Sequence, residues 1–127
     1  MVAIAAGMLF ASVLHGNRAV AGTPVIVAFG DSLTAGFGLQ NSDSFPAQLE
    51  KALKARGQDV KVINAGVSGD TAAAGLARLD WALPDDASGV IIELGANDAL
   101  QGLDPVATKA TLEQMITKIK ARGLPIL

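Results

Sequence analysis

The chain has 127 residues, a formal net charge of −2 and a hydrophobic share of 50%. This length fits one domain, and the high apolar content together with 17% charged residues excludes a disordered tail. The near-neutral charge argues against a nucleic-acid binder, which would carry a basic surface. Because the sequence has no cysteine, disulfides, thiolate zinc sites and a cysteine nucleophile are excluded.

An uncharged apolar run, residues 2–14, stands near the N-terminus. The run is too short to span a bilayer, which takes about 20 apolar residues. It is followed at residues 19–21 by Ala-Val-Ala, the small-x-small pattern that signal peptidases cut. We therefore predict a signal peptide over residues 1–21, with an ordinary buried helix as the alternative. The mature part, residues 22–127, is then periplasmic or secreted and keeps no stable membrane anchor.

The mature part opens with a strand and a helix. Residues 24–29 are a short apolar run bounded by glycine, as expected for a buried parallel strand. A polar turn follows at residues 30–34. Ser44 is expected to cap a helix that has Pro46 in its first turn and ends at Gly57. The side chains at helical spacing, which we expect to face inward, are Phe45, Leu49, Ala52 and Leu53.

A second strand and helix follow. The pattern of residues 60–64 predicts the strand, and either Asp70 or Thr71 can cap the helix. This helix ends before Pro84 because proline cannot continue it. Its inward side chains are predicted to be Leu76 and Leu79.

The last predicted elements are two strands and one helix. Residues 89–94 predict a third strand, and residues 104–105, Asp-Pro, are a strong helix start. Gly123 ends this helix, and residues 125–127 begin a fourth strand. Four apolar side chains at spacings of three and four are expected to face inward: Leu112, Met115, Ile116 and Ile119.

The alternation of strands and helices predicts an α/β fold with a parallel sheet and helices on both faces. In such a sheet, ligands bind outside the carboxyl ends of the strands. Each of the first three strands runs into a polar loop that contains glycine. These loops are residues 30–33, 67–71 and 95–98. We expect a functional site where the three loops meet.

Each loop has one candidate residue with a structural alternative. Ser32 could be a nucleophile, although serine is also a favoured helix cap. Gly69 could present its N–H to a substrate, or it could be an ordinary turn glycine. The Asn97 amide could donate to an oxyanion, or it could form a turn with Asp98. Taken singly, each residue favours the structural alternative.

Together the three loops resemble the first three sequence blocks of the SGNH (GDSL) hydrolases. The matching stretches are Phe29-Gly30-Asp31-Ser32-Leu33-Thr34-Ala35-Gly36, Val67-Ser68-Gly69-Asp70-Thr71 and Glu93-Leu94-Gly95-Ala96-Asn97-Asp98. They look most like the branch of periplasmic arylesterases, thioesterases and lysophospholipases. The resemblance runs from about Pro24 to Leu127, and it implies a flavodoxin-like three-layer α/β/α sandwich.

The resemblance also implies a chemistry. Ser32 would attack an ester or thioester carbonyl and form an acyl-enzyme. The N–H groups of Ser32 and Gly69 and the Asn97 side chain would form the oxyanion hole. Asp31 would brace the nucleophile turn. The residues that would flank the acyl chain are Ala99, Leu100 and Gly102.

One departure from the family pattern concerns the fourth block, an Asp and a His three residues apart. This block is missing, and the sole histidine, His15, lies in the predicted signal peptide. We therefore expect a C-terminally incomplete N-terminal fragment that is inactive as it stands. Ala96 stands where this branch often has glycine. Glu93, an acid in an apolar strand, is expected to be a polar residue at the exposed strand end.

Two other functions remain as alternatives. One is a non-catalytic flavodoxin-like module that holds a phosphate or a flavin, and the other is a degenerate homologue without activity. For the hydrolase we expect a small acyl-ester or thioester substrate, no nucleic-acid partner, no cofactor and no metal site, because the carboxylates are scattered along the sequence. The oligomeric state and the acyl-chain length cannot be predicted from the residues.

Overall fold

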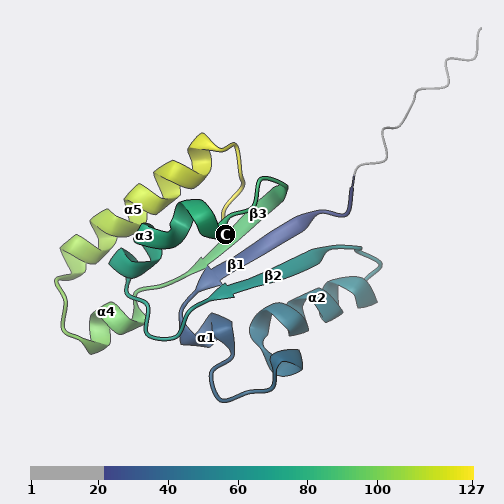
Figure 1. Ribbon diagram of the computed structural model, residues 1–127, viewed down its shortest axis with the longest axis horizontal. Helices are drawn as coiled ribbons and strands as arrows, with labels where there is room; N and C mark the ends of the chain where they lie inside the picture. The colour runs from purple at the N-terminus through teal and green to yellow at the C-terminus, as the bar shows by residue number, and fades with distance from the viewer. Residues whose placement is uncertain (1–21) are drawn as a thin grey trace, which may run out of the picture.

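A parallel sheet with the strand order β2-β1-β3 crosses the computed structural model, which describes residues 22–127 (Figure 1). Its strands are β1 (Val25–Gly30), β2 (Lys61–Gly66) and β3 (Ala87–Glu93). Near the chain end, Ile126 forms a parallel bridge with Val90, which extends the sheet beyond β3. The predicted parallel sheet is thus confirmed. The predicted signal peptide, residues 1–21, lies outside the described residues.

Helices cover both faces of the sheet (Figure 1). Helix α2 (Phe45–Ala55) lies on one face, and α3 (Ala72–Ala82) and α5 (Pro105–Ala121) lie together on the other. The main core fills the space between the sheet and the α3–α5 pair. Its buried members are Val27, Phe29, Leu79, Leu83, Val90, Met115 and Ile119. The three-layer arrangement follows from strands that are apolar toward both faces.

Three short helices complete the fold. They are α1 (Ser32–Ala35), the 3₁₀ turn η1 (Asn41–Asp43) and α4 (Ala96–Leu100). The loop that we expected at residues 95–98 therefore becomes a helix from Ala96 onward. Gly95 makes this possible because it takes a left-handed conformation with φ +116° at the helix start. No helix within residues 22–127 combines the length and the apolar character that a membrane crossing requires.

The start of α2 differs from its prediction. Ser44 is at the N-cap position, but its hydroxyl donates to the Asn41 carbonyl at 2.8 Å and caps no N–H of the helix. Phe45 is 46% exposed and Ala52 is also exposed, so the predicted inward face is wrong at these positions. The side chains that turn inward are Pro46, Leu49 and Leu53, which follow the helical period from Pro46 instead of Phe45.

The other two long helices begin at side-chain caps. The Thr71 hydroxyl accepts the Ala74 N–H at 3.2 Å, which selects Thr71 over Asp70 as the cap of α3. Asp104 accepts the Val106 N–H at 2.9 Å at the start of α5, as its position before a proline predicts. The ends of the three strands differ from the predictions by one or two residues, because strand pairing and not hydropathy sets them.

Candidate active site

Three loops at the carboxyl ends of the strands are joined by hydrogen bonds. The Asn97 amide Nδ2 donates to Asp31 Oδ2 at 3.1 Å and to the Asp70 carbonyl at 2.9 Å. The Val67 N–H donates to the Gly30 carbonyl at 2.9 Å. In Figure 1 the same end of the sheet carries α1 and α4. The loops after β1, β2 and β3 therefore meet, as expected for parallel strands.

Ser32 is the first residue of α1 and is half-buried. Asp31 precedes it as the N-cap, and its carboxylate accepts the Leu33 N–H at 2.9 Å. Asp31 is 1% exposed, so the turn that carries Ser32 is built on a buried carboxylate. Within residues 22–127 the Ser32 N–H has no hydrogen-bond acceptor, as is usual in the first turn of a helix. This N–H is available to a ligand.

Gly30, at the end of β1, is in a position that admits only glycine. A Cβ there would collide with the Thr34 hydroxyl and would lie 2.6 Å from the Glu93 carbonyl. The turn that carries Ser32 is therefore packed directly against the end of β3. This close approach explains why the first block has glycine before the Asp-Ser pair.

Gly69 lies in the exposed loop between β2 and α3. Its φ of +88° is in the left-handed region, and a Cβ on it would meet nothing within 4 Å. No group among the described residues accepts its N–H. The left-handed backbone conformation at this position thus favours glycine, and the Gly69 N–H is free to donate.

The Asn97 amide is already engaged in this structure. Its Nδ2 bonds with Asp31 and Asp70 account for the two hydrogens of the side-chain amide. An oxyanion at this position would therefore take over one N–H from one of these acceptors. Asn97 both connects the loops and supplies a donor that can be redirected.

Glu93 is one of the site residues whose role the sequence did not reveal. Its Oε2 accepts the Thr34 hydroxyl at 3.0 Å and the Asp31 N–H at 3.4 Å. The expectation of a polar residue at an exposed strand end is therefore wrong, because the glutamate turns under α1 and supports the turn that carries Ser32. Burial raises the pKa of the Glu93 carboxyl above its ordinary value, and the nearby Asp31 adds to this effect. An acid within an apolar strand was the available signal.

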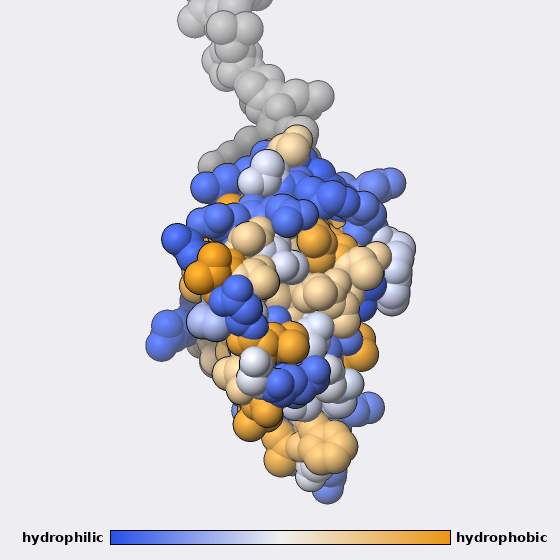
Figure 2. All heavy atoms as spheres, turned by 90° about the vertical axis from the view of Figure 1, so that its left-hand side faces the viewer, coloured by the Kyte–Doolittle hydropathy of each residue, from blue (hydrophilic) through white to orange (hydrophobic). Residues whose placement is uncertain are grey.

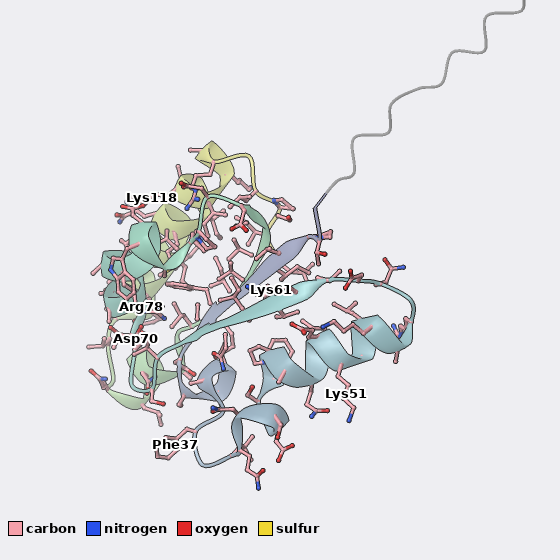
Figure 3. All side chains as sticks on the ribbon, turned by 45° about the vertical axis from the view of Figure 1, so that its right-hand side comes forward. Phe37, Lys51, Lys61, Asp70, Arg78 and Lys118 are labelled. Carbon is pink, nitrogen blue, oxygen red and sulfur yellow. The ribbon has the colours of Figure 1, made fainter. Side chains whose placement is uncertain are left out.

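Arg78, on α3, was also missed. Its Nε donates to Asp70 Oδ2 at 2.6 Å, and its other guanidinium nitrogen donates to the Gly30 carbonyl at 2.9 Å. Its guanidinium carbon lies 4.0 Å from the centre of the buried Phe29 ring. Figure 3 shows Arg78 and Asp70 next to each other between α3 and the loop before it. The feature of the sequence that could have identified Arg78 is an arginine at a helix position that faces the core.

Asp98 does not form the turn with Asn97 that we considered. It is buried, and its carboxylate accepts the Ala72 N–H at 2.8 Å and the Thr108 hydroxyl at 3.0 Å. It therefore links α4 to the first turns of α3 and α5. This contact network required the tertiary structure, because Ala72 lies 26 residues away.

The residues expected to flank an acyl chain lie on or just after α4. Leu100 is 84% exposed, Ala99 and Gly102 are also exposed, and Ala99 lines a cavity of about 240 Å³. Figure 2 shows apolar side chains spread over this end of the molecule, between polar ones. The exposed apolar residues of the loops and helix starts here are Leu33, Phe37, Leu39, Val67, Leu100, Leu103 and Val106. In Figure 3, Phe37 points away from the fold.

The carboxylates near Ser32 do not form a metal centre. Within residues 22–127 no three acidic or histidine side chains gather as metal ligands. The acids near Ser32 instead accept hydrogen bonds from N–H and hydroxyl donors of the chain. The arrangement is suited to receiving a negatively charged oxygen beside a serine hydroxyl.

Comparison with known proteins relates these loops to one family. The sequence model described as the GDSL-like Lipase/Acylhydrolase family matches residues 28–127. Esterase TesA of Pseudomonas aeruginosa is 42% identical over 118 residues, which are 92% of this chain and 58% of that protein. An arylesterase of Vibrio mimicus is 44% identical and is matched over 80% of this chain and 52% of its own length.

Solved structures agree with the sequence matches. AlinE4, an esterase of the SGNH-hydrolase family, superposes with a TM-score of 0.79 and is 47% identical, over 82% of this chain and 57% of AlinE4. A crystal structure of TesA gives a TM-score of 0.76 at 41% identity, over 80% of this chain and 57% of TesA. The chain thus spans little more than half the length of the relatives that it matches.

Proposed function

The chain belongs to the GDSL-like lipase/acylhydrolase family, and we propose that it carries the acyl-accepting half of a carboxylic-ester or thioester hydrolase with Ser32 as nucleophile. The family resemblance of the three loops is confirmed by the matches above. The observation that supports the proposal most directly is the Asn97–Asp31 hydrogen bond of 3.1 Å. It brings the third loop to the nucleophile turn, where a reacting carbonyl would lie.

The proposed reaction has two steps. The Ser32 hydroxyl oxygen bonds to the carbonyl carbon, and the carbonyl oxygen becomes an oxyanion that accepts hydrogen bonds from the N–H groups of Ser32 and Gly69 and from the Asn97 amide. The leaving alcohol or thiol departs with a proton, and an acyl-enzyme remains. Water then hydrolyses the acyl-enzyme and returns Ser32 to its free form.

The proton of Ser32 must go to a base during attack. Residues 22–127 contain no histidine, and neither Asp31 nor Glu93 is hydrogen-bonded to the Ser32 hydroxyl. We therefore assign no proton acceptor within them. General base catalysis typically contributes about 10²–10⁴-fold, so these residues by themselves should be acylated slowly.

The proposed substrate is a small molecule with an apolar acyl chain. The exposed leucines and the phenylalanine around the loops favour an apolar group over a charged one. The relatives named above include an esterase and an arylesterase. Both oxygen and sulfur esters fit the proposed oxyanion hole, because the N–H donors contact the carbonyl oxygen and not the leaving group.

Labelling with an alkyl fluorophosphonate tests the nucleophile. In the full-length protein, the probe should form an adduct on the peptide that contains Ser32, and Ser32→Ala should abolish it. Ser42→Ala is the matched control, because Ser42 is exposed on η1 and its hydroxyl contacts only Asp43 among the described residues. An adduct that persists in Ser32→Ala, or no adduct on the unaltered protein, would overturn the proposal.

We also propose that residues 1–21 are removed on export to the periplasm or the medium. The Ala-Val-Ala triplet at residues 19–21 supports this proposal. N-terminal sequencing of the mature protein should start at Gly22. A mature protein that begins at Met1 and stays in the cytoplasmic fraction would contradict it.

A further inference from the structure

A closed ring of polar contacts connects the three loops at the candidate site. Arg78 joins the Gly30 carbonyl to the Asp70 carboxylate, at 2.9 and 2.6 Å. The Asp70 carbonyl accepts from Asn97 at 2.9 Å, and Asn97 donates to Asp31 at 3.1 Å. Asp31 follows Gly30 in the chain, which closes the ring. We call these five residues the polar ring.

Burial makes the Arg78–Asp70 contact a strong constraint. The two side chains are only 9% and 12% exposed, so the ion pair is shielded from water. A guanidinium has a planar fork of N–H donors, which allows one side chain to hold two acceptors at a defined separation. Here one acceptor, Gly30, is the last residue of β1, and the other, Asp70, lies in the loop after β2. Arg78 thereby sets the distance between the end of β1 and that loop.

The loop with Gly69 is held at Val67 by the Gly30 carbonyl, at 2.9 Å, and at Asp70 by the contact with Arg78. Gly69 is exposed, and a Cβ built on it would meet no atom within 4 Å. Its neighbour Asp70, in contrast, is held through its carboxylate by Arg78 and through its carbonyl by Asn97. The position of the Gly69 N–H therefore follows from the position of Asp70.

We propose that Arg78 is a positioning residue that aligns the N–H groups of Ser32 and Gly69 on one oxyanion through the polar ring. This inference rests on the proposed function and deepens it. Arg78 is buried beneath the loops and against Phe29, so it touches no substrate. Its effect is on the geometry of donors that act in the transition state. Loss of that geometry should lower kcat more than it changes KM.

Substitution of Arg78 by lysine in the full-length protein separates positioning from charge. Lysine keeps the positive charge but cannot hold the Asp70 and Gly30 acceptors with a planar fork. We expect kcat for 4-nitrophenyl butyrate to fall by about 10- to 100-fold, with KM within about twofold. Rates are divided by the number of sites that the fluorophosphonate titrates, so that misfolded protein does not count.

Two companion variants sharpen the test. Lys118→Met removes an ion pair of the same 2.6 Å length, between Lys118 and Asp80, which is exposed and distant from the loops. It should leave kcat unchanged. In an Asp70→Asn background, Arg78→Lys should lower kcat by a smaller factor than in the unaltered protein, because the two residues act through one contact.

Amide hydrogen exchange supplies a readout that does not depend on activity. Arg78→Lys should speed exchange at residues 67–71 while the β1 amides stay protected. An Arg78→Lys variant with native kcat and unchanged amide exchange in this loop would overturn the inference. A fall in kcat that is equal with Asp70 and with Asn at position 70 would overturn it as well. If the unaltered protein fails to react with the phosphonate, the proposed function falls, and the exchange experiment still decides whether Arg78 holds the loop.

Discussion

Asn97 donates its side-chain amide to the carboxylate of Asp31, 66 residues earlier in the chain, at a distance of 3.1 Å. This hydrogen bond ties the start of α4 to the turn that carries Ser32. Because Asp31 also accepts the Leu33 N–H, one buried carboxylate organises both the turn that carries Ser32 and the position of Asn97.

Replacement of Asn97 by alanine removes both the hydrogen bond to Asp31 and the proposed oxyanion donor. In the full-length protein, Asn97→Ala should reduce kcat for an aryl ester by about 10²–10³, the usual effect of losing one oxyanion donor. Steady-state kinetics measures the change. Gln101→Ala, at an exposed position just after the same helix, is the control. A kcat within twofold of the unaltered value would remove Asn97 from the proposed oxyanion hole.

Gly69 and Gly57 form a matched pair for testing the second donor. Both are exposed, both have left-handed backbones with φ +88° and +76°, and neither has an atom within 4 Å of a built Cβ. Alanine at either position should lower the free energy of unfolding by a similar amount, about 1 to 2 kcal/mol, through backbone strain.

Activity should separate the two glycine variants. Gly57 follows α2, away from the three loops, so Gly57→Ala should keep its kcat. Gly69→Ala should lose kcat, because relief of the strain turns the N–H away from the oxyanion. Urea unfolding and ester hydrolysis, measured on the same preparations, provide the comparison. Equal kcat values for both variants would contradict the role of Gly69.

The raised pKa of Glu93 predicts a pH-dependent stability. The folded protein holds the Glu93 proton more tightly than the unfolded chain does. The contribution of Glu93 to the free energy of unfolding is therefore largest at low pH. It is lost as the pH rises from the ordinary glutamate pKa to the raised one. Glu93→Gln cannot ionise and still offers an oxygen to Thr34. Its stability relative to the unaltered protein should therefore increase with pH through that window.

Unfolding in urea at a series of pH values measures this difference. Glu113→Gln, at an exposed glutamate on α5, controls for the loss of one negative charge. A Glu93→Gln variant whose relative stability stays constant with pH, or declines as pH rises, would show that folding does not raise the pKa of Glu93.

Asp98→Ala tests the link between α4 and the long helices. The substitution removes the acceptor of the Ala72 N–H and of the Thr108 hydroxyl in a buried place. The free energy of unfolding should fall by about 1 to 3 kcal/mol because these donors lose their partner. Asp86→Ala, at an exposed acid, should change it by less than about 0.5 kcal/mol. Equal effects of the two substitutions would contradict the structural role of Asp98.

The accuracy of the sequence-based predictions depended on how local each signal was. The strands appeared as apolar runs because parallel strands are buried on both faces. The start of α5 was correct because Asp104 caps its own helix two residues away. Helix α4 was missed, since five residues are too few to show a helical period. The inward face of α2 was misassigned because Phe45 remains outside the core.

The candidate site also has a part that could be predicted from the sequence and a part that could not. Parallel topology alone brings the loops with Ser32, Gly69 and Asn97 to one edge of the sheet, so their meeting could be predicted. The contacts of Glu93 and Arg78 could not, because the partners of Arg78 include a carbonyl 48 residues away. Nothing in the local pattern states which donor will reach a given acceptor.

The sequence by itself determined the alternation of strands and helices, the cap of α5 and the three loops that bear the family's residues, because these features depend on neighbours within a turn or a strand. Only the tertiary structure decided that Gly30, Asp31, Asp70, Arg78 and Asn97 form the polar ring. The reason is physical: a buried polar group must find a partner wherever packing places one, and packing is a property of the folded chain as a whole.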